Sequence, residues 1–378
     1  MSIYYVIFWS LSFFSFLEQF TNISKKAKKS IISVYSVLFI IMSTVYAGIL
    51  GDYQQYEDFF YYVTANDLKY IFNGWFEFLY TLVNLAVKSM IPNYVALRFF
   101  LALFVILLWH LIYTTDKISI IGKNPISAML IVWSLNFGNV FIARSTIAIA
   151  LCLFSMKYVE RKDFQKFLAC TMIAIGFHTM SICWLPVYMI YHNVRHRIIY
   201  AFSILSFLFI MLFYNKIPAI LEMAAFISPQ RIQRSLYTYI SYGTSNMLGM
   251  NYSMGFIILK GMANIFLLIT AFSYLNFRYR KRCCLKNKCF ENYFKVYLIG
   301  TVIYAVSMPV SVGLSRAAIP FTLTSSFLLP HIFQLPELQK KMWMRLIVFI
   351  LFIMYLFFRF YLNIKNGTDE FKTIFSLI

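Results

Sequence analysis

Long apolar runs with almost no charged residues recur along this chain, and they restrict its possible folds more than any other feature. A helix needs about 20 mostly apolar residues to cross a bilayer. Ten stretches come close to that requirement: 3–20, 31–50, 94–113, 125–142, 144–160, 198–215, 251–275, 294–311, 316–334 and 345–362. Only 13% of the 378 residues are charged and 61% are apolar, whereas a soluble protein carries about 25% charged residues. Because the runs are continuous and not alternating, the sequence predicts an all-α, polytopic integral membrane protein.

The net charge of +20 comes largely from short loops beside the apolar runs. In a soluble protein this charge would indicate a nucleic-acid partner, but lysine and arginine in short loops mark the cytoplasmic side of a membrane protein. We therefore expect no nucleic-acid partner. Five basic loops are predicted to lie inside: 21–30, 157–166, 191–197, 278–290 and 335–345.

Two apolar stretches do not fit a single crossing. Residues 164–190 have basic loops at both ends, so we expect two short helices with an outer turn near His178. Residues 74–91 carry Glu77 and Lys88, and a crossing there would contradict the sides of the neighbouring loops. We expect a re-entrant segment, which is stable only where it packs against protein or lines a polar cavity.

These assignments give twelve crossings, two of them short, and one re-entrant segment in a single membrane domain over 1–378. Both termini and the two large loops, 51–73 and 216–250, are predicted to face outside. The first residues, MSIYYVIFW, lack the basic region of a signal peptide, so we expect the first span to be retained. The six cysteines lie in apolar runs or in a cytosolic loop, so we expect no disulfide framework.

In this topology, five arginines lie at or beyond the outer membrane boundary: Arg98, Arg144, Arg231, Arg234 and Arg316. An arginine at mid-span costs about 2.5–3.5 kcal/mol, and outward arginines oppose the usual charge bias. The guanidinium group binds phosphate through two parallel hydrogen bonds. The cluster therefore predicts an outer-face cavity that binds a diphosphate. Alternatively, Arg98 extends to lipid headgroups, and Arg231 and Arg234 belong to an amphipathic surface helix.

The loop 51–73 combines carboxylates with tyrosines, as carbohydrate sites do. The residues predicted to bind sugar are Tyr53, Tyr56, Glu57, Asp58 and, beyond the loop, Glu77. An ordinary aromatic belt at the membrane interface is the alternative for the tyrosines. A divalent ion on Glu57 and Asp58 is a further alternative, although arginines can supply the charge, and we expect no metal and no cofactor.

Two residues are candidates for a catalytic base. His178 lies at a predicted outer turn between two short helices, and we place it first, although a lone histidine is often only a packing residue. Asp52 lies where a span meets the outer loop, where burial can raise its pKa, and we place it second. Glu57, Asp58 and Glu77 are alternative bases.

Two blocks and one late arginine carry a family resemblance. They are GDYQQYEDFFYY followed by WFEFLYTLVNL, then NVFIARSTIAIALCLFSMKYVERKDFQKFLACTMIAIGFHTMSICWLP, and Arg316 in SRAAIPF. With these blocks the chain resembles the EpsG-type polysaccharide polymerases, which are close to the Wzy O-antigen polymerases. The resemblance implies an inner-membrane glycosyltransferase, with an architecture like that of the GT-C class, that joins repeat units carried on undecaprenyl diphosphate at the periplasmic face.

The resemblance also implies partners and roles. The partners would be a lipid-linked glycan donor and acceptor, membrane lipids and a chain-length regulator protein. Arg144 and Arg316 would hold the leaving diphosphate, with Arg98, Arg231 and Arg234 as additional contacts. Two other functions stay open: a flippase for lipid-linked sugars, and an O-antigen ligase. Against them, the chain shows no repeated halves, and the loop 216–250 has no histidine.

Overall fold

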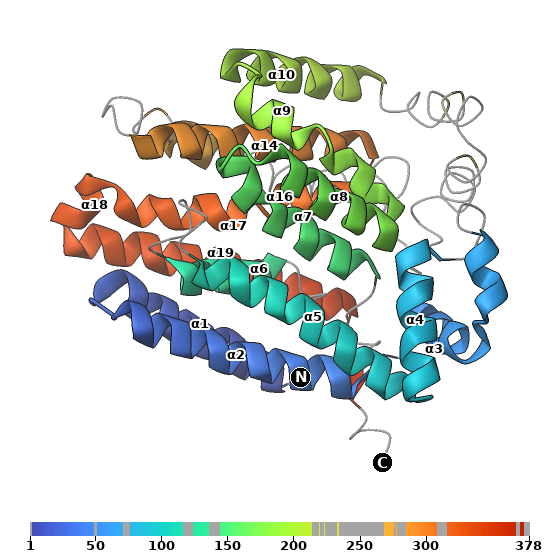
Figure 1. Ribbon diagram of the computed structural model, residues 1–378. Coiled ribbons are helices and arrows are strands. Elements are labelled where there is room, and N and C mark those ends of the chain that lie inside the picture. Colours follow the sequence, from blue (N-terminus) through green and yellow to red (C-terminus); the bar gives the residue numbers. More distant parts are fainter. Residues whose placement is uncertain are drawn as a thin grey trace. The chain divides into compact units, whose positions relative to one another are not determined.

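The computed structural model describes residues 2–48, 51–70, 76–115, 124–135, 144–213, 268–275, 285–307, 316–367 and 371–373, with the single residues 219, 223, 233 and 277 (Figure 1). Most of the predicted outer loop 216–250 and of the predicted span 251–275 lies outside this range, as do Arg231 and Arg234. The chain divides into two compact units, Met1–Thr179 with Leu329–Ile378, and Met180–Leu328.

The described elements of the first unit are helical apart from one pair of short strands. Its elements are α1 (Ser2–Phe20), α2 (Lys25–Val45), β1 (Tyr46–Gly48), α3 (Gly51–Tyr62), the 3₁₀ helix η1 (Ala65–Tyr70), α4 (Phe78–Met90), α5 (Tyr94–Thr114), α6 (Pro125–Leu135), α7 (Arg144–Glu160), α8 (Phe164–Phe177), η6 (Leu329–Gln334), α18 (Pro336–Lys340), α19 (Met342–Gly367) and β2 (Phe371–Thr373). The strands β1 and β2 pair antiparallel, with Tyr46 opposite Thr373, and the sequence did not predict them.

The described elements of the second unit are also helical. They are the end of η3 (Thr179–Trp184), α9 (Val187–His192), α10 (His196–Phe213), α14 (Leu285–Ser307), η5 (Arg316–Ala318), α16 (Ile319–Thr322) and α17 (Ser325–Leu328). Helix α14 is held to α9 by Lys295, whose ammonium donates to the carbonyl oxygens of Tyr191 (2.9 Å) and Val194 (3.0 Å).

Among the described residues, four helices are long and apolar enough to cross a membrane: Ile3–Phe20, Lys25–Val45, Tyr94–Thr114 and Met342–Leu362. They confirm the all-α membrane class. Shorter apolar helices include Phe78–Met90, Pro125–Leu135, Phe164–Phe177 and His196–Phe209. The count of twelve crossings stays a prediction.

The break predicted near His178 is present. Helix α8 begins after Asp163, whose carboxylate accepts from the backbone N–H of Lys166 (3.2 Å), and it ends at Phe177 with His178 as the extended C-cap residue. The chain continues as the 3₁₀ helix η3 and then as the six-residue α9, so the second short helix is more irregular than predicted.

One prediction about local structure was wrong. The predicted span 316–334 is not one helix but a series of short α and 3₁₀ pieces. Pro320 and Pro330 lack the N–H that a continuous helix needs, and buried hydroxyls such as Ser326 Oγ bond nearby carbonyls (2.7 Å to Leu323 O). The segment 51–73, predicted to face outside, is largely helical over its described residues, and Tyr56 and Phe60 pack inward at helical spacing.

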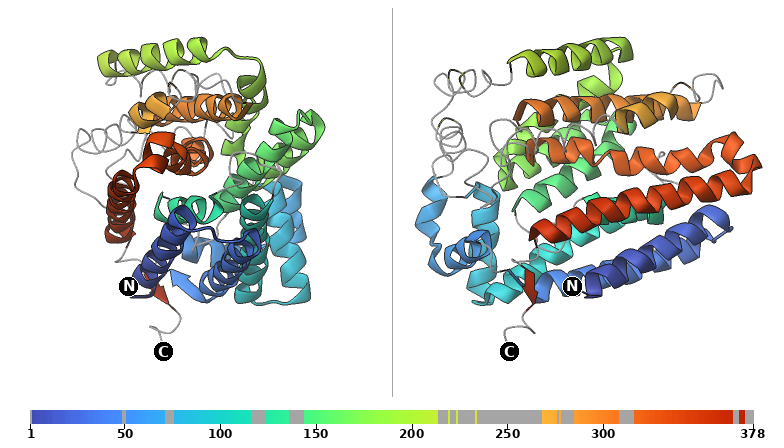
Figure 2. Two further views of the ribbon diagram at one scale, coloured as in Figure 1. Left: turned by 90° about the vertical axis from the view of Figure 1, so that its left-hand side faces the viewer. Right: turned by 180° about the vertical axis from the view of Figure 1, so that it is seen from behind.

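The first unit has two distinct ends, which Figures 1 and 2 show. The α1–α2 turn and α18 lie at one end, and α3 and α4 lie at the other. The basic segments 21–30 and 335–345, both predicted inside, therefore share one end of the unit. Helix α5 connects the two ends, and its 21 residues make it about 30 Å long.

Candidate active site

Glu77 stands at the centre of a polar cluster at the α3–α4 end of the first unit. It is the extended N-cap residue of α4. One carboxylate oxygen, Oε2, accepts a hydrogen bond from Arg144 Nη1, and the other, Oε1, lies 3.4 Å from His178 Nδ1. The backbone N–H and the hydroxyl of Thr179 each donate to Oε1 at 3.2 Å. One carboxylate thus joins the start of α4, the start of α7 and the end of α8.

Exposure separates the roles of these three side chains. The Glu77 side chain is only 6% exposed, whereas Arg144 and His178 are 24% and 16% exposed. Because a carboxylate can only accept hydrogen bonds, the His178 contact requires the proton on Nδ1, and Nε2 of a neutral ring is then the acceptor. The side chains of Arg144 and His178 are therefore partly accessible, whereas Glu77, which contacts both of them, is buried.

Arg144 is the first residue of α7, and its guanidinium is fixed on three sides. Besides Glu77, it donates through Nε to the hydroxyl of Tyr56 (3.3 Å), and its Cζ atom lies 4.8 Å from the centre of the Phe76 ring. A guanidinium has five N–H donors, and the contacts to Glu77 and Tyr56 account for two of them. The Arg144 side chain is thus held in place by these three neighbours.

Arg98, on α5, forms a second arginine–tyrosine contact, and its partner Tyr53 lies on the same helix α3 as Tyr56. It is buried, and it donates to the Ser43 carbonyl oxygen (2.7 Å) and to the Tyr53 hydroxyl (3.3 Å). The inward direction of this side chain disagrees with the alternative in which Arg98 extends to lipid headgroups. Tyr53 and Tyr56 are three residues apart on one face of α3, so this helix connects both arginines.

Two tyrosines of α3, Tyr53 and Tyr56, pack into the protein and do not form a belt, whereas Tyr61 and Tyr62 are exposed. The ring of Tyr56 is buried, stacked on Phe76 (5.2 Å between centres) and edge-on to Tyr80 (5.6 Å). Tyr53 is half-buried and packs edge-on to Tyr94 (5.6 Å). Tyr56 therefore presents its hydroxyl to the cluster, and its ring faces are occupied by protein.

The pKa values of Glu77 and Glu57 are shifted in opposite directions. Burial alone would raise the pKa of Glu77, but the hydrogen bond with His178 and the positive charge of Arg144 outweigh burial and hold this pKa well below its usual range. For Glu57, burial raises the pKa, although Arg98 opposes it. Glu77 is therefore a poor proton acceptor, and Glu57 is the better one of the two.

The low pKa of Glu77 predicts how stability depends on pH. A carboxyl group whose pKa is lowered on folding stabilises the protein above its unfolded pKa, near 4.5, and this stabilisation is lost as pH falls through the folded value. We expect Glu77→Gln to cost near the lower end of about 3–5 kcal/mol at neutral pH, as for a broken buried ion pair. The difference in unfolding temperature from the wild type should shrink on acidification below about pH 4.5.

Asp58→Asn is the matched control for this measurement. Asp58 is exposed on α3 and accepts from Gln54 Nε2 (3.0 Å). It should unfold like the wild type at every pH. A Glu77→Gln difference that stayed constant from neutral to acidic pH would contradict the ion-pair assignment.

Gly176 allows α8 to approach α4 closely enough for His178 to reach Glu77. A Cβ atom at position 176 would lie 2.5 Å from Leu79 Cδ1 and 2.7 Å from Leu79 Cγ. We expect Gly176→Val to force the two helices apart and to lower activity about tenfold or more, as overpacking costs about 1–3 kcal/mol. Adding Leu79→Ala should restore activity by making room. If Leu79→Ala gave no relief in a product assay, the contact would not be what positions His178.

The remaining predicted site residues lie elsewhere or outside the described range. Asp52 belongs to the first turn of α3, and its side chain lies outside the described residues, as do Arg231 and Arg234. Arg316 is exposed at the start of η5 in the second unit. Within the described ranges, no three histidine, cysteine or acidic side chains lie close enough to hold a metal ion.

Sequence reasoning missed the central role of Glu77 and the contribution of Thr179. One signal was available: a carboxylate between Phe76 and Phe78 in an apolar stretch requires a cationic partner. The sequence alone could not say which arginine that partner is.

Comparison with known families shows the family of this chain. Residues 28–374 match the model of the EpsG family, so nearly the whole chain is covered and the protein belongs to the EpsG family. Membership in this family suggests a polysaccharide-polymerase-like membrane protein, as the sequence blocks around Tyr56 and Arg144 indicated. No curated protein and no solved structure matches the chain significantly.

Proposed function

We propose that this protein is a polymerase that joins oligosaccharide repeat units carried on undecaprenyl diphosphate, producing O-antigen or a related surface polysaccharide. The observation that carries the proposal is the Glu77 carboxylate, which holds Arg144 and His178 side by side. Glycosyl transfer needs a cation for the leaving diphosphate and a base for the attacking hydroxyl, and these two side chains are of those types.

The reaction transfers the growing glycan from one lipid to the terminal sugar of a unit on another. The bond between the anomeric carbon and the diphosphate oxygen breaks, and its electron pair leaves with the diphosphate. Arg144 stabilises that developing charge, which is typically worth about 2.7–4 kcal/mol for one well-placed donor. Arg316, Arg231 and Arg234 remain proposed contacts for the donor or acceptor lipid.

His178 takes the proton of the acceptor hydroxyl as the new carbon–oxygen bond forms. A base held by a carboxylate on its other nitrogen is a recurring arrangement in acyl-transfer enzymes, because the carboxylate fixes the tautomer and stabilises the protonated ring. Glu77 is therefore a positioning residue. Arg98 has a similar supporting role, since it fixes α3 through Tyr53. Glu57 and Asp58 stay proposed sugar ligands.

The finer topology is part of the same proposal. The end of the first unit with Glu77 would face the periplasm, and the end with the α1–α2 turn would face the cytoplasm, as the positive charges of 21–30 and 335–345 favour. Twelve crossings with the segment around α4 not crossing would place an outer cavity above the cluster. Helix α4 has only 13 residues, or about 20 Å, which is too short to span the hydrocarbon core.

Surface polysaccharide from a strain that lacks the gene tests this function against its rivals. We expect single repeat units on a gel in place of long chains, and recovery of long chains on complementation. Loss of every surface unit would identify a flippase, and long chains that stay on the carrier lipid would identify a ligase. Unchanged chain lengths would contradict a role in polymerisation.

A further inference from the structure

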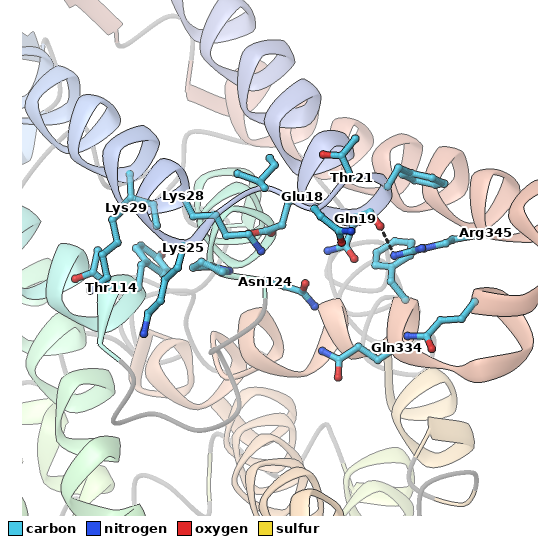
Figure 3. Close-up of a pocket in the computed structure, with 18 of the residues that line it drawn as sticks. Glu18, Gln19, Thr21, Lys25, Lys28, Lys29, Thr114, Asn124, Gln334 and Arg345 are labelled. Atoms are coloured by element: carbon cyan, nitrogen blue, oxygen red, sulfur yellow. Dashed lines mark hydrogen bonds and ion pairs between the residues drawn. The ribbon is translucent and has the colours of Figure 1, made fainter.

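A second polar site lies at the other end of the first unit from the candidate active site. A pocket of about 800 Å³ opens between the α1–α2 turn, the end of α5, the start of α6 and the segment from η6 to α19 (Figure 3). Sites for small ligands have about 300–1,000 Å³. Thr114 at the end of α5 lines this pocket, whereas Arg98 near its start contacts Tyr53, so about 25 Å of helix separates the two sites.

The lining of this pocket is strongly positive. Its described residues include four cationic side chains and one carboxylate, a net of +3: Lys25, Lys28, Lys29, Arg345 and Glu18. The carboxylate is already engaged. Glu18 accepts from the backbone N–H groups of Ile126 (3.1 Å) and Ser127 (2.8 Å) at the start of α6, and Lys28 Nζ lies 3.4 Å away. The negative charge of Glu18 therefore compensates Lys28 and the N-terminus of α6. The other cations of the lining keep the pocket positive.

The positions of the cations are built into the fold. Arg345 donates to the carbonyl oxygen of Gln19, and its guanidinium lies 5.1 Å from the Phe20 ring centre. In Figure 3, Lys25 enters from one side and Arg345 from the other, with the amides of Asn124 and Gln334 between them. The Asn124 amide donates to the Pro330 carbonyl oxygen (3.2 Å), and the Gln334 amide adds hydrogen-bond donors between the charges, a combination that suits oxygen-rich anions.

We propose that this pocket binds a phosphate-bearing anion, either the headgroup of an anionic phospholipid or a soluble diphosphate. Ammonium and guanidinium groups are the usual protein partners of phosphate oxygens. If the lysines served only to fix the cytoplasmic side, they would not need to surround a cavity. In this structure the lysines and Arg345 line one. Anionic lipids in the cytoplasmic leaflet and soluble diphosphates would both meet this end of the protein in the orientation proposed above.

Two pairs of substitutions test the pocket. Lys25→Gln with Lys29→Gln removes two exposed cations from the lining, one turn apart on α2, and leaves Lys28 paired with Glu18. Lys340→Gln with Lys341→Gln is the control, because these exposed lysines lie at the same end but not in the lining. Full-length protein in phosphatidylcholine nanodiscs is titrated with inorganic pyrophosphate in one arm. In the other arm, retention of added cardiolipin is measured by native mass spectrometry.

We expect the wild type and the control pair to bind alike, and the lining pair to bind about tenfold or more weakly, at an unchanged unfolding temperature. Binding in the pyrophosphate arm identifies a soluble ligand, and binding in the cardiolipin arm alone identifies a lipid headgroup. A component of pyrophosphate binding at the Arg144 site would not respond to either pair. The proposal is overturned if the wild type binds in neither arm, or if both pairs weaken binding equally, since diffuse surface charge would then explain it.

Discussion

Arg144→Lys should reduce polymer formation by about a hundredfold or more, while the amount of protein in the membrane stays close to that of the wild type. Lysine keeps the positive charge that the buried Glu77 requires, so folding is largely preserved. It cannot contact Glu77 and Tyr56 and also present the planar fork to a phosphate. Loss of one donor to a developing anion typically costs about 10²–10³ in rate. Purified enzyme with a lipid-linked donor gives the rate, and an immunoblot gives the abundance.

A structural role for Arg144 must be separated from a role in the reaction, because its removal leaves Glu77 without its cation. The double variant Arg144→Gln with Glu77→Gln removes both charges, and we expect it to recover abundance but not activity. The single variant Glu77→Gln is the reference, since its amide oxygen can still accept from His178. If the double variant were as active as Glu77→Gln alone, Arg144 would serve only to neutralise Glu77. Arg161→Lys, in an exposed turn, should change nothing.

The membrane class and the break at His178 were predictable because their signals are local. An apolar run of 20 residues predicts a helix whatever surrounds it. The basic residues on both sides of 164–190 required a turn between them, and the structure ends α8 at Phe177. The prediction of one span over 316–334 was wrong because its local apolar signal was misleading. That stretch is apolar enough for a span, but its prolines and hydroxyl groups give the backbone other hydrogen-bond partners.

The partners within the site could not be predicted, because they depend on tertiary packing. Glu77 is separated from Arg144 by 67 residues and from His178 by 101. Their meeting depends on the close contact that Gly176 allows between α4 and α8. The sequence names Arg144 and His178 as candidates by residue type and predicted side, and the structure brings both side chains to Glu77. The sequence groups Glu77 with the sugar ligands and the alternative bases, because an acidic residue beside aromatic residues has the same sequence pattern whether it binds sugar or holds other side chains in place.

The basic pocket also depends on tertiary packing, so the sequence alone does not predict it. In the sequence, Lys25 and Lys29 indicate only the side of the membrane, as four lysines near the end of a span do. The cavity becomes visible only when Asn124 and Gln334, over 90 residues from the lysines in sequence, join them. One set of charges can therefore serve orientation during insertion and binding in the folded protein.

His178→Ala should abolish polymer while single repeat units persist, and Asp52→Asn should have a much smaller effect. His178 is the partly exposed imidazole whose Nδ1 is held by Glu77, and loss of a general base typically costs about 10²–10⁴ in rate. His178→Gln sharpens the test, because its amide can still donate to Glu77 but cannot accept the hydroxyl proton. If His178 acts as the base, glutamine will preserve abundance and remain as slow as alanine. Recovery of polymer with glutamine would reduce His178 to a positioning residue, and loss of polymer in Asp52→Asn alone would make Asp52 the base.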